Sequence, residues 1–202
     1  MTITRERFDA AMTPAQYVAA MEQNREQFEA NLAATRITDE ERGFFAGLRS
    51  TLNVLVLSEN WCPDCTTNVP IIVRLAKETD GLNVRLLKRD GNEEIADQYT
   101  LADGRNHIPT YIILDENLHE LGYFLERPQA VTERLAEVRA GWYAAHPNLD
   151  PSAPLSEAPA ELRAEFRDVY GAARRSLWDF EQREIIAVFR AIAERALSAS
   201  VR

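Results

Sequence analysis

Cysteine and histidine are scarce in this chain of 202 residues. Both of its cysteines lie in one tetrapeptide, Cys62-Pro63-Asp64-Cys65. A single close pair excludes the framework of several disulfides that staples small secreted domains. A tetrahedral metal site would need two further ligands. Of the three histidines only His107 is placed to approach the cysteines, whereas His119 and His146 are expected at the surface or in caps.

Positive charge and long apolar runs are also lacking. Lys and Arg number 23 against 32 Asp and Glu, which gives a net charge of −9. Nucleic acids and anionic membranes are bound through clustered Lys and Arg, so neither is an expected partner. No apolar run approaches the ~20 residues that span a bilayer, and the first residues carry an acid and no apolar core of a signal peptide. These absences predict a cytoplasmic protein, in which an isolated cysteine pair is catalytic or metal-binding rather than a structural staple.

Residues 1–50 are predicted to form a helical N-terminal extension. Thr13 and Pro14 give a start signal, a hydroxyl N-cap followed by proline at the first helical position. Thr38 gives a second start, with Glu41 three residues later as its capping-box partner. Two helices are therefore expected, the first carrying apolar residues at roughly helical spacing: Tyr17, Met21, Phe28 and Leu32.

Residues 51–146 show a mixed pattern that predicts one α/β domain. An almost continuous apolar run at 53–58 is typical of a strand buried on both faces. The pattern then predicts, in order, a helix over 63–79 containing Pro70, a strand over 83–88, a short helix over 93–101, strands over 111–114 and 118–125, and a helix from 128 to about 145. Strands joined through helices imply parallel crossovers, and the final hairpin implies an antiparallel edge.

Residues 147–202 are predicted to be a linker followed by a C-terminal helical segment. Four prolines mark the linker, and residues 161–197 are helical in character. Gly171 is the expected break if this segment is a helical pair rather than one long helix. Its two apolar faces are consistent with packing on the α/β domain and with a homodimer formed through the C-terminal helices, and both alternatives stay open.

The cysteine pair stands where a buried strand passes into a helix, which is typical of a redox dithiol. Cys62 is expected at the N-terminal end of the helix, where unpaired N–H groups and the helix dipole favour a thiolate. Pro63 suits the first helical position, where its missing N–H costs nothing. Cys65 lies three residues on and about one turn away, so its sulfur can reach that of Cys62. The expected roles are nucleophile for Cys62 and resolving thiol for Cys65.

Three features occur in a characteristic order. Trp61 and the cysteine motif follow Ser58-Glu59-Asn60 and a buried strand, Pro70 lies five residues beyond Cys65, and Ile108-Pro109-Thr110 precedes the hairpin. In this order they resemble the thioredoxin superfamily, in particular bacterial thioredoxin-like proteins with a helical N-terminal extension and a Ser-Glu-x-Trp-Cys-x-Asp-Cys active site. The resemblance covers about residues 52–145. It implies a three-layer α/β/α thioredoxin-like fold to which the flanking helices are additions.

The resemblance also assigns neighbours to the cysteines. It implies that Trp61 flanks the site, that Ile108 offers its backbone to an extended substrate segment, and that the Ile108–Pro109 peptide is cis. The sequence departs from the family where thioredoxins carry a buried aspartate and a facing lysine, since Val56 and Leu86 stand there. Losing both charges together avoids an unpaired buried charge. Asp64 is a hypothetical replacement acceptor for the proton of Cys65, although its charge opposes a thiolate at Cys62.

These features predict a thiol-disulfide oxidoreductase that reduces disulfides through Cys62 and Cys65, with low turnover of general disulfides. No organic cofactor is required. The expected partners are a protein or small-molecule disulfide substrate and a separate thiol reductant or reductase. One alternative is a redox-sensing or partner-binding module with little turnover. Another is a metal-binding module, which would hold stoichiometric metal under reducing conditions.

Overall fold

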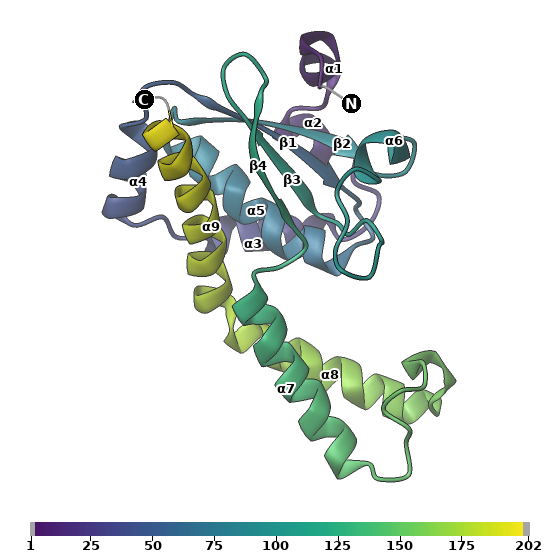
Figure 1. Ribbon diagram of the computed structural model, residues 1–202. Helices are drawn as coiled ribbons and strands as arrows, with labels where there is room; N and C mark the ends of the chain where they lie inside the picture. Colours follow the sequence, from purple (N-terminus) through teal and green to yellow (C-terminus); the bar gives the residue numbers. More distant parts are fainter. Residues whose placement is uncertain (1–2, 200–202) are drawn as a thin grey trace. The chain divides into compact units, whose positions relative to one another are not determined.

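The computed structural model describes residues 3–199. It contains one sheet of four strands in the order β2-β1-β3-β4, with helices on both faces (Figure 1). The strands are β1 (Leu52–Ser58), β2 (Leu82–Lys88), β3 (Thr110–Leu114) and β4 (Glu120–Leu125). The predicted α/β class and the four strands are confirmed, with ends that differ by at most two residues from those predicted.

The central strand β1 pairs parallel with β2 and antiparallel with β3. The prediction that helix-joined strands run parallel is therefore right for β1 and β2 and wrong for β3. The connection from β2 to β3 contains only α6 (Glu93–Ala96), a helix of four residues, in place of the longer helix predicted over 93–101. The rest of that connection consists of turns and an isolated bridge, so it lacks the full crossover helix that parallel pairing requires.

The N-terminal extension forms four helices rather than the two predicted. They are α1 (Arg5–Ala10), α2 (Pro14–Ala19), α3 (Arg25–Ala34) and α4 (Asp39–Ala46). Both predicted starts are confirmed, since Thr13 and Thr38 each form a capping box. The helix expected after Thr13 is divided: α2 ends with Ala20 as its C-cap, and Asn24, in a left-handed conformation with φ of 57°, is the N-cap from which α3 begins.

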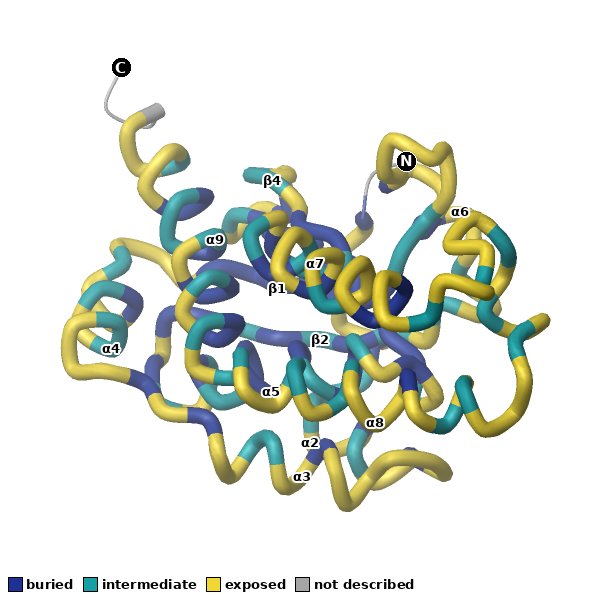
Figure 2. The backbone as a smooth tube through the Cα atoms, turned by 90° about the horizontal axis from the view of Figure 1, so that it is seen from below, coloured by how far each residue is buried: buried dark blue, intermediate teal, exposed yellow. Residues whose placement is uncertain are grey.

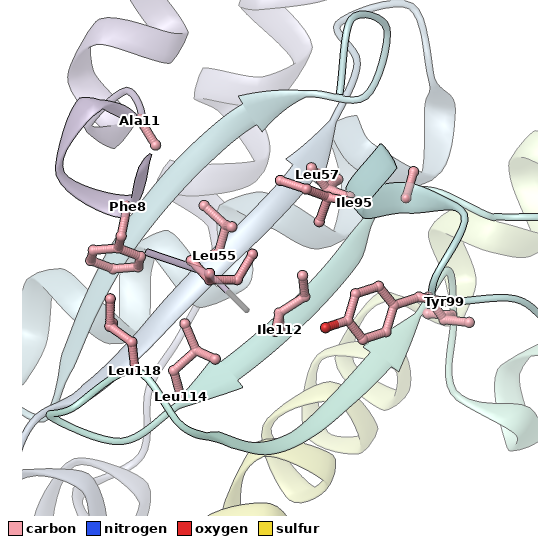
Figure 3. Close-up of a cluster of buried hydrophobic side chains, with 12 residues drawn as sticks. Phe8, Ala11, Leu55, Leu57, Ile95, Tyr99, Ile112, Leu114 and Leu118 are labelled. Atoms are coloured by element: carbon pink, nitrogen blue, oxygen red, sulfur yellow. The ribbon is translucent and has the colours of Figure 1, made fainter. Parts of the chain in front are cut away.

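One face of the sheet is closed by the N-terminal segment and by α6. Leu55 and Leu57 of β1 and Ile112 of β3 point to this face, where they meet Phe8 of α1 and Ile95 of α6 (Figure 3). Alternate residues of a strand point to opposite faces, so Leu55 and Leu57, two residues apart in β1, lie on the same face. The same segment also covers the edge of the sheet, because Met12 exchanges two backbone hydrogen bonds with Leu86.

The opposite face of the sheet carries the other residues of β1 and is covered by α5 (Pro63–Glu78). Every residue of β1 is buried, as expected for a strand covered on both faces (Figure 2). On the outer side of α5 lies α3, where the Asn31 amide donates to the Thr66 carbonyl at 3.0 Å. The second half of α9 (Trp178–Ala199) covers this face near β3, where the ring of Phe189 meets that of Tyr111.

The chain divides into two compact units, residues 1–127 with 185–202 and residues 128–184. The second unit contains α7 (Gln129–Ala145), a short 3-10 helix (Leu155–Glu157), α8 (Ala160–Ser176) and the start of α9. Its core is an aromatic cluster of Trp142, Tyr143 and Phe166. The C-terminal helices form a pair, but the break falls at Leu177 and not at Gly171, which lies inside α8. The predicted boundaries at 50 and 146 stay a prediction.

Candidate functional site

The motif Cys62-Pro63-Asp64-Cys65 lies where β1 passes into α5, and both cysteines are free thiols. Cys62 is the N-cap of α5, and its Sγ accepts a hydrogen bond from the backbone N–H of Cys65 at 3.4 Å. Pro63 occupies the start of the helix. Its missing N–H is one of those that a helix leaves unpaired there, so the sequence forms the turn without loss of a hydrogen bond. The exposed fractions are 6% for Cys62 and 1% for Cys65.

The Cys62 side is arranged for a thiolate. The Cys65 thiol lowers the pKa of Cys62 by hydrogen bonding to its sulfur, and the backbone N–H groups of Cys65 and Asp64 lower it further. Burial and the negative charge of Asp64 oppose this shift without reversing it. The Cys62 Sγ also lies 3.6 Å from the Ile108 carbonyl oxygen, so the sulfur faces the loop before β3.

The Cys65 side is arranged for a neutral thiol. Burial raises the pKa of Cys65 well above its usual value, and the hydrogen bond and charge of Cys62 raise it further. A hydrogen bond with the Ser58 hydroxyl and one with the Glu59 backbone N–H lower it in part. Two thiols one helical turn apart therefore favour opposite protonation states, as a nucleophile and a resolving thiol require.

The loop Ile108-Pro109 lies beside Cys62, and its peptide bond is cis. The loop is held at both ends, since Thr110 Oγ1 donates to the His107 carbonyl at 2.7 Å and the Glu126 N–H donates to the Pro109 carbonyl at 2.8 Å. These bonds leave the Ile108 carbonyl directed at the thiol. The structure thus brings Ile108 and Pro109 to the cysteines, as the resemblance implies.

Trp61 flanks the motif with 45% of its surface exposed. The Arg89 guanidinium lies 5.8 Å from its ring centroid, within range of a cation–π contact. Because the ring stays largely open to solvent next to Cys62, it offers an apolar surface at the mouth of the site.

Asp64 forms an ion pair with Arg127, a residue for which the sequence predicts no role. Both of its carboxylate oxygens accept from Nη1 of Arg127, each at 2.8 Å. Arg127 Nη2 also lies 2.8 Å from Glu126, whose other carboxylate oxygen is 3.2 Å from His107 Nδ1. His107 Nε2 is in turn 2.9 Å from Asp103. A chain of paired polar side chains therefore links Asp64 to the loop that carries Ile108, and the pairing with Arg127 favours Asp64 as an ion-pair partner over Asp64 as a base for Cys65.

Two hydroxyl groups to which the sequence assigned no role, those of Ser58 and Tyr17, lie near Cys65. Ser58 is the last residue of β1 and fully buried, and its Oγ lies 2.9 Å from the Tyr17 Oη of α2. The position of Ser58 at the carboxyl end of a parallel strand is the signal that points to a site. Glu59 is also buried, with 5% of its surface exposed, and accepts from the Asp90 N–H.

Val56 and Leu86 are neighbours in the register of β1 and β2, and both are fully buried. Two apolar side chains therefore stand side by side at this place in the core. Among residues 3–199, no group of three or more His, Cys, Asp and Glu side chains is arranged to hold a metal ion. Within the same residues no helix is both long and apolar enough to cross a membrane.

The strand order, the helix-capping thiol and the adjoining cis-proline loop define a thioredoxin-like class of protein. A family model described as Thioredoxin matches residues 11–139. The chain therefore belongs to the thioredoxin family. No curated protein matches it.

Two solved structures resemble the chain over most of its length. One is the crystal structure of an HIV epitope-scaffold, with 19% identity and a TM-score of 0.62 over 94% of this chain and 96% of the other. The second is a protein of unknown function from Pseudomonas aeruginosa, with 21% identity and a TM-score of 0.57 over 84% and 95%. At these identities the likeness shows the fold alone, so function is argued from the site.

Proposed function

We propose that the protein is a thiol-disulfide oxidoreductase that reduces disulfides through Cys62 and Cys65. The observation that carries the proposal is the asymmetry of the two thiols. The pKa of Cys62 is lowered at the N-terminus of α5, whereas that of Cys65 is raised by burial. A family domain with a nearby cysteine pair fits a redox role, and this asymmetry assigns a separate step to each cysteine.

In the first step the Cys62 thiolate attacks one sulfur of a substrate disulfide. A bond forms between Cys62 Sγ and that sulfur, the substrate S–S bond breaks, and the other substrate sulfur leaves as a thiolate. The Cys65 N–H, which now donates to Cys62 Sγ, stabilises the attacking anion. Trp61 and the Ile108 carbonyl flank the sulfur and offer an apolar and a polar contact to the chain around the substrate disulfide.

In the second step Cys65 loses its proton and attacks Cys62 Sγ. A bond forms between the two cysteine sulfurs, the mixed disulfide breaks, and the substrate leaves with two electrons gained and both of its sulfurs as thiols once protonated. The oxidised Cys62–Cys65 pair is returned to dithiol by a separate thiol reductant or reductase. The proposal assigns this chemistry to a reducing compartment, the cytoplasm, where an isolated cysteine pair stays reduced between turnovers.

The low exposure of both sulfurs limits which disulfides react. With Cys62 at 6% exposure, a substrate must bring its disulfide up to a buried sulfur beside the Ile108 carbonyl. We therefore expect slow reduction of general disulfides and faster reduction of a substrate whose chain fits against this sulfur.

The test compares two variants in reduction of a protein disulfide, with dithiothreitol as the reductant. Cys62→Ser is expected to lower the rate to that of dithiothreitol alone, because the nucleophile is lost. Reduced Cys65→Ser, freed of dithiothreitol and mixed with the protein disulfide, is expected to accumulate a covalent adduct between Cys62 and the substrate, visible by mass under non-reducing conditions. Turnover that survives Cys62→Ser would refute the proposal. Absent turnover in the unaltered protein, together with a redox-dependent change in partner affinity, would favour the redox-sensing alternative.

A further inference from the structure

The helical N-terminal extension reaches the resolving thiol. Tyr17 of α2 is buried, with its ring against Phe28 of α3 and its hydroxyl 2.9 Å from Ser58 Oγ. Ser58 in turn lies close enough to the sulfur of Cys65 for its hydroxyl to lower the pKa of that thiol. Three groups from α2, β1 and α5 are thus connected in one line that ends on a reacting atom.

When Cys65 is a thiolate, each of the two hydroxyls has a single hydrogen to donate, and this determines which group is the donor in each hydrogen bond. A thiolate accepts and cannot donate, so Ser58 must give its single hydrogen to the sulfur. The contact of 2.9 Å between the hydroxyls then needs Tyr17 as its donor. Burial raises the pKa of Tyr17, so its hydroxyl keeps the hydrogen that this arrangement requires.

The charged and titratable groups around the line offer Cys65 little other help. Those that act on Tyr17 are Cys62, Cys65 and the buried Glu59, and each would carry negative charge when ionised. Glu59 accepts the Asp90 N–H and supplies its own backbone N–H to Cys65. Val56, on the same strand as Ser58, is apolar and fully buried. The surroundings therefore stabilise a thiolate at Cys65 through neutral hydrogen-bond donors.

We propose that Tyr17 and Ser58 form a hydroxyl pair that stabilises the Cys65 thiolate in the resolving step. The inference rests on the proposed function and adds the N-terminal helix α2 to the site. As the proton leaves Cys65 for solvent or for the departing substrate sulfur, Ser58 donates to the negative sulfur and Tyr17 donates to Ser58. The thiolate then bonds to Cys62 Sγ, and the bond from Cys62 to the substrate breaks. Ser58 contacts the reacting atom, whereas Tyr17 is a positioning residue.

Equimolar dithiobis(nitrobenzoic acid) separates the two steps in a rapid-mixing experiment. Attack by Cys62 releases one coloured thiolate, and resolution by Cys65 releases a second. Tyr17→Phe removes only the hydroxyl and is expected to slow the second release by about five- to tenfold, with the first unchanged. The pH at which the second release reaches half of its maximal rate should rise in this variant, because a less stabilised thiolate forms at higher pH.

Two further variants make the test specific. Ser58→Ala should slow the second release at least as much, and the double variant should be no slower than Ser58→Ala, because Tyr17 acts through Ser58. Tyr99→Phe is the matched control, since Tyr99 is also buried and loses one hydrogen bond, to Glu120 at 2.7 Å, away from the thiols. It should leave both releases unchanged.

A second release in Tyr17→Phe with the rate and pH midpoint of the unaltered protein would overturn the inference. So would equal slowing of both releases, which indicates a structural role, or fully additive effects of Tyr17→Phe and Ser58→Ala. Failure of the proposed function looks different, because the unaltered protein would then give no first release or Cys62→Ser would still give it.

Discussion

The two cysteines of the motif are three residues apart and lie in opposite environments. Cys62 faces the mouth of the site, beside an exposed tryptophan, a proline loop and the unpaired N–H groups of a helix. Cys65 faces the core, beside two hydroxyls and an apolar strand. The surroundings of Cys62 supply hydrogen-bond donors to a sulfur anion. The surroundings of Cys65 exclude water from a sulfur that stays protonated. Burial and helix position, rather than a charged base, thus divide the chemistry between them.

On the Cys65 side of the motif, which we call the inner side, the neighbouring Val56 and Leu86 are apolar and fully buried. On the Cys62 side of the motif, which we call the outer side, the negative charge of Asp64 is paired with Arg127. Substitutions on the two sides should therefore have different effects. Those on the inner side should alter the stability of the fold and the resolving step, whereas those on the outer side should alter the pKa of Cys62.

The largest expected effect comes from returning a carboxyl group to the inner side. Val56→Asp should lower the free energy of unfolding by about 3–5 kcal/mol at pH 8, because Leu86 offers it no opposite charge. Burial raises the folded-state pKa of the new carboxyl above its unfolded value of about 4, so the loss should shrink as the pH falls towards 4. Denaturant unfolding at several pH values measures this.

Val56→Asn is the matched control, since it has the same shape and does not titrate. Its destabilisation should be independent of pH over the same range. If Val56→Asp and Val56→Asn lose the same stability at pH 8 and at pH 5, the inner side tolerates a charge and the comparison fails there.

A smaller effect is expected from exposing the charge of Asp64 on the outer side. Arg127→Leu removes the partner of that carboxylate, so its negative charge should raise the pKa of Cys62 by about one unit, equivalent to about 1.4 kcal/mol. The pH dependence of iodoacetamide alkylation of Cys62 measures the shift.

The double variant Asp64→Asn with Arg127→Leu removes both charges and should return the pKa of Cys62 to its original value or below. A double variant that keeps the raised pKa would mean that Arg127 acts through packing and not through the charge of Asp64.

The smallest effect is expected at the far end of the ion-pair chain. The backbone N–H of Arg105 and the side chain of His107 hold the pKa of Asp103 at about 2, below its ordinary value of 3.8. Such a group adds stability above pH 3.8 that is lost as the pH falls towards 2. Asp103→Asn should therefore lower the melting temperature slightly at pH 6 and leave it unchanged near pH 2. A difference that is equal at both pH values would contradict this assignment.

Much of the fold was open to prediction from the sequence. The apolar run at 53–58, the capping boxes at Thr13 and Thr38 and the turn signals gave the strands and the main helix starts, because each rests on neighbouring residues. The direction of β3 was not predictable in this way. A connection of mixed turns around the four-residue α6 leaves no local mark of whether the next strand returns parallel or antiparallel.

The candidate site shows the same limit more sharply. The motif and the Ile108-Pro109 loop were identified because each is a short pattern of residues. Tyr17 was assigned only to an apolar helix face and Arg127 not at all, since each reaches the motif across more than forty residues of chain. The burial of Glu59 was not predictable for the same reason, because this side chain contacts the Asp90 segment that follows β2.

The central claim is that Cys62 ionises before Cys65, and alkylation followed by peptide mass analysis tests it directly. The reduced protein is pulsed with iodoacetamide across a range of pH, and the modified fraction of each cysteine is determined separately. We expect the modification of Cys62 to reach half of its maximum at a pH below the pKa of an ordinary thiol, about 8.5, while Cys65 stays unmodified throughout. Modification of Cys65 at the same pH as Cys62, or at a lower one, would contradict it.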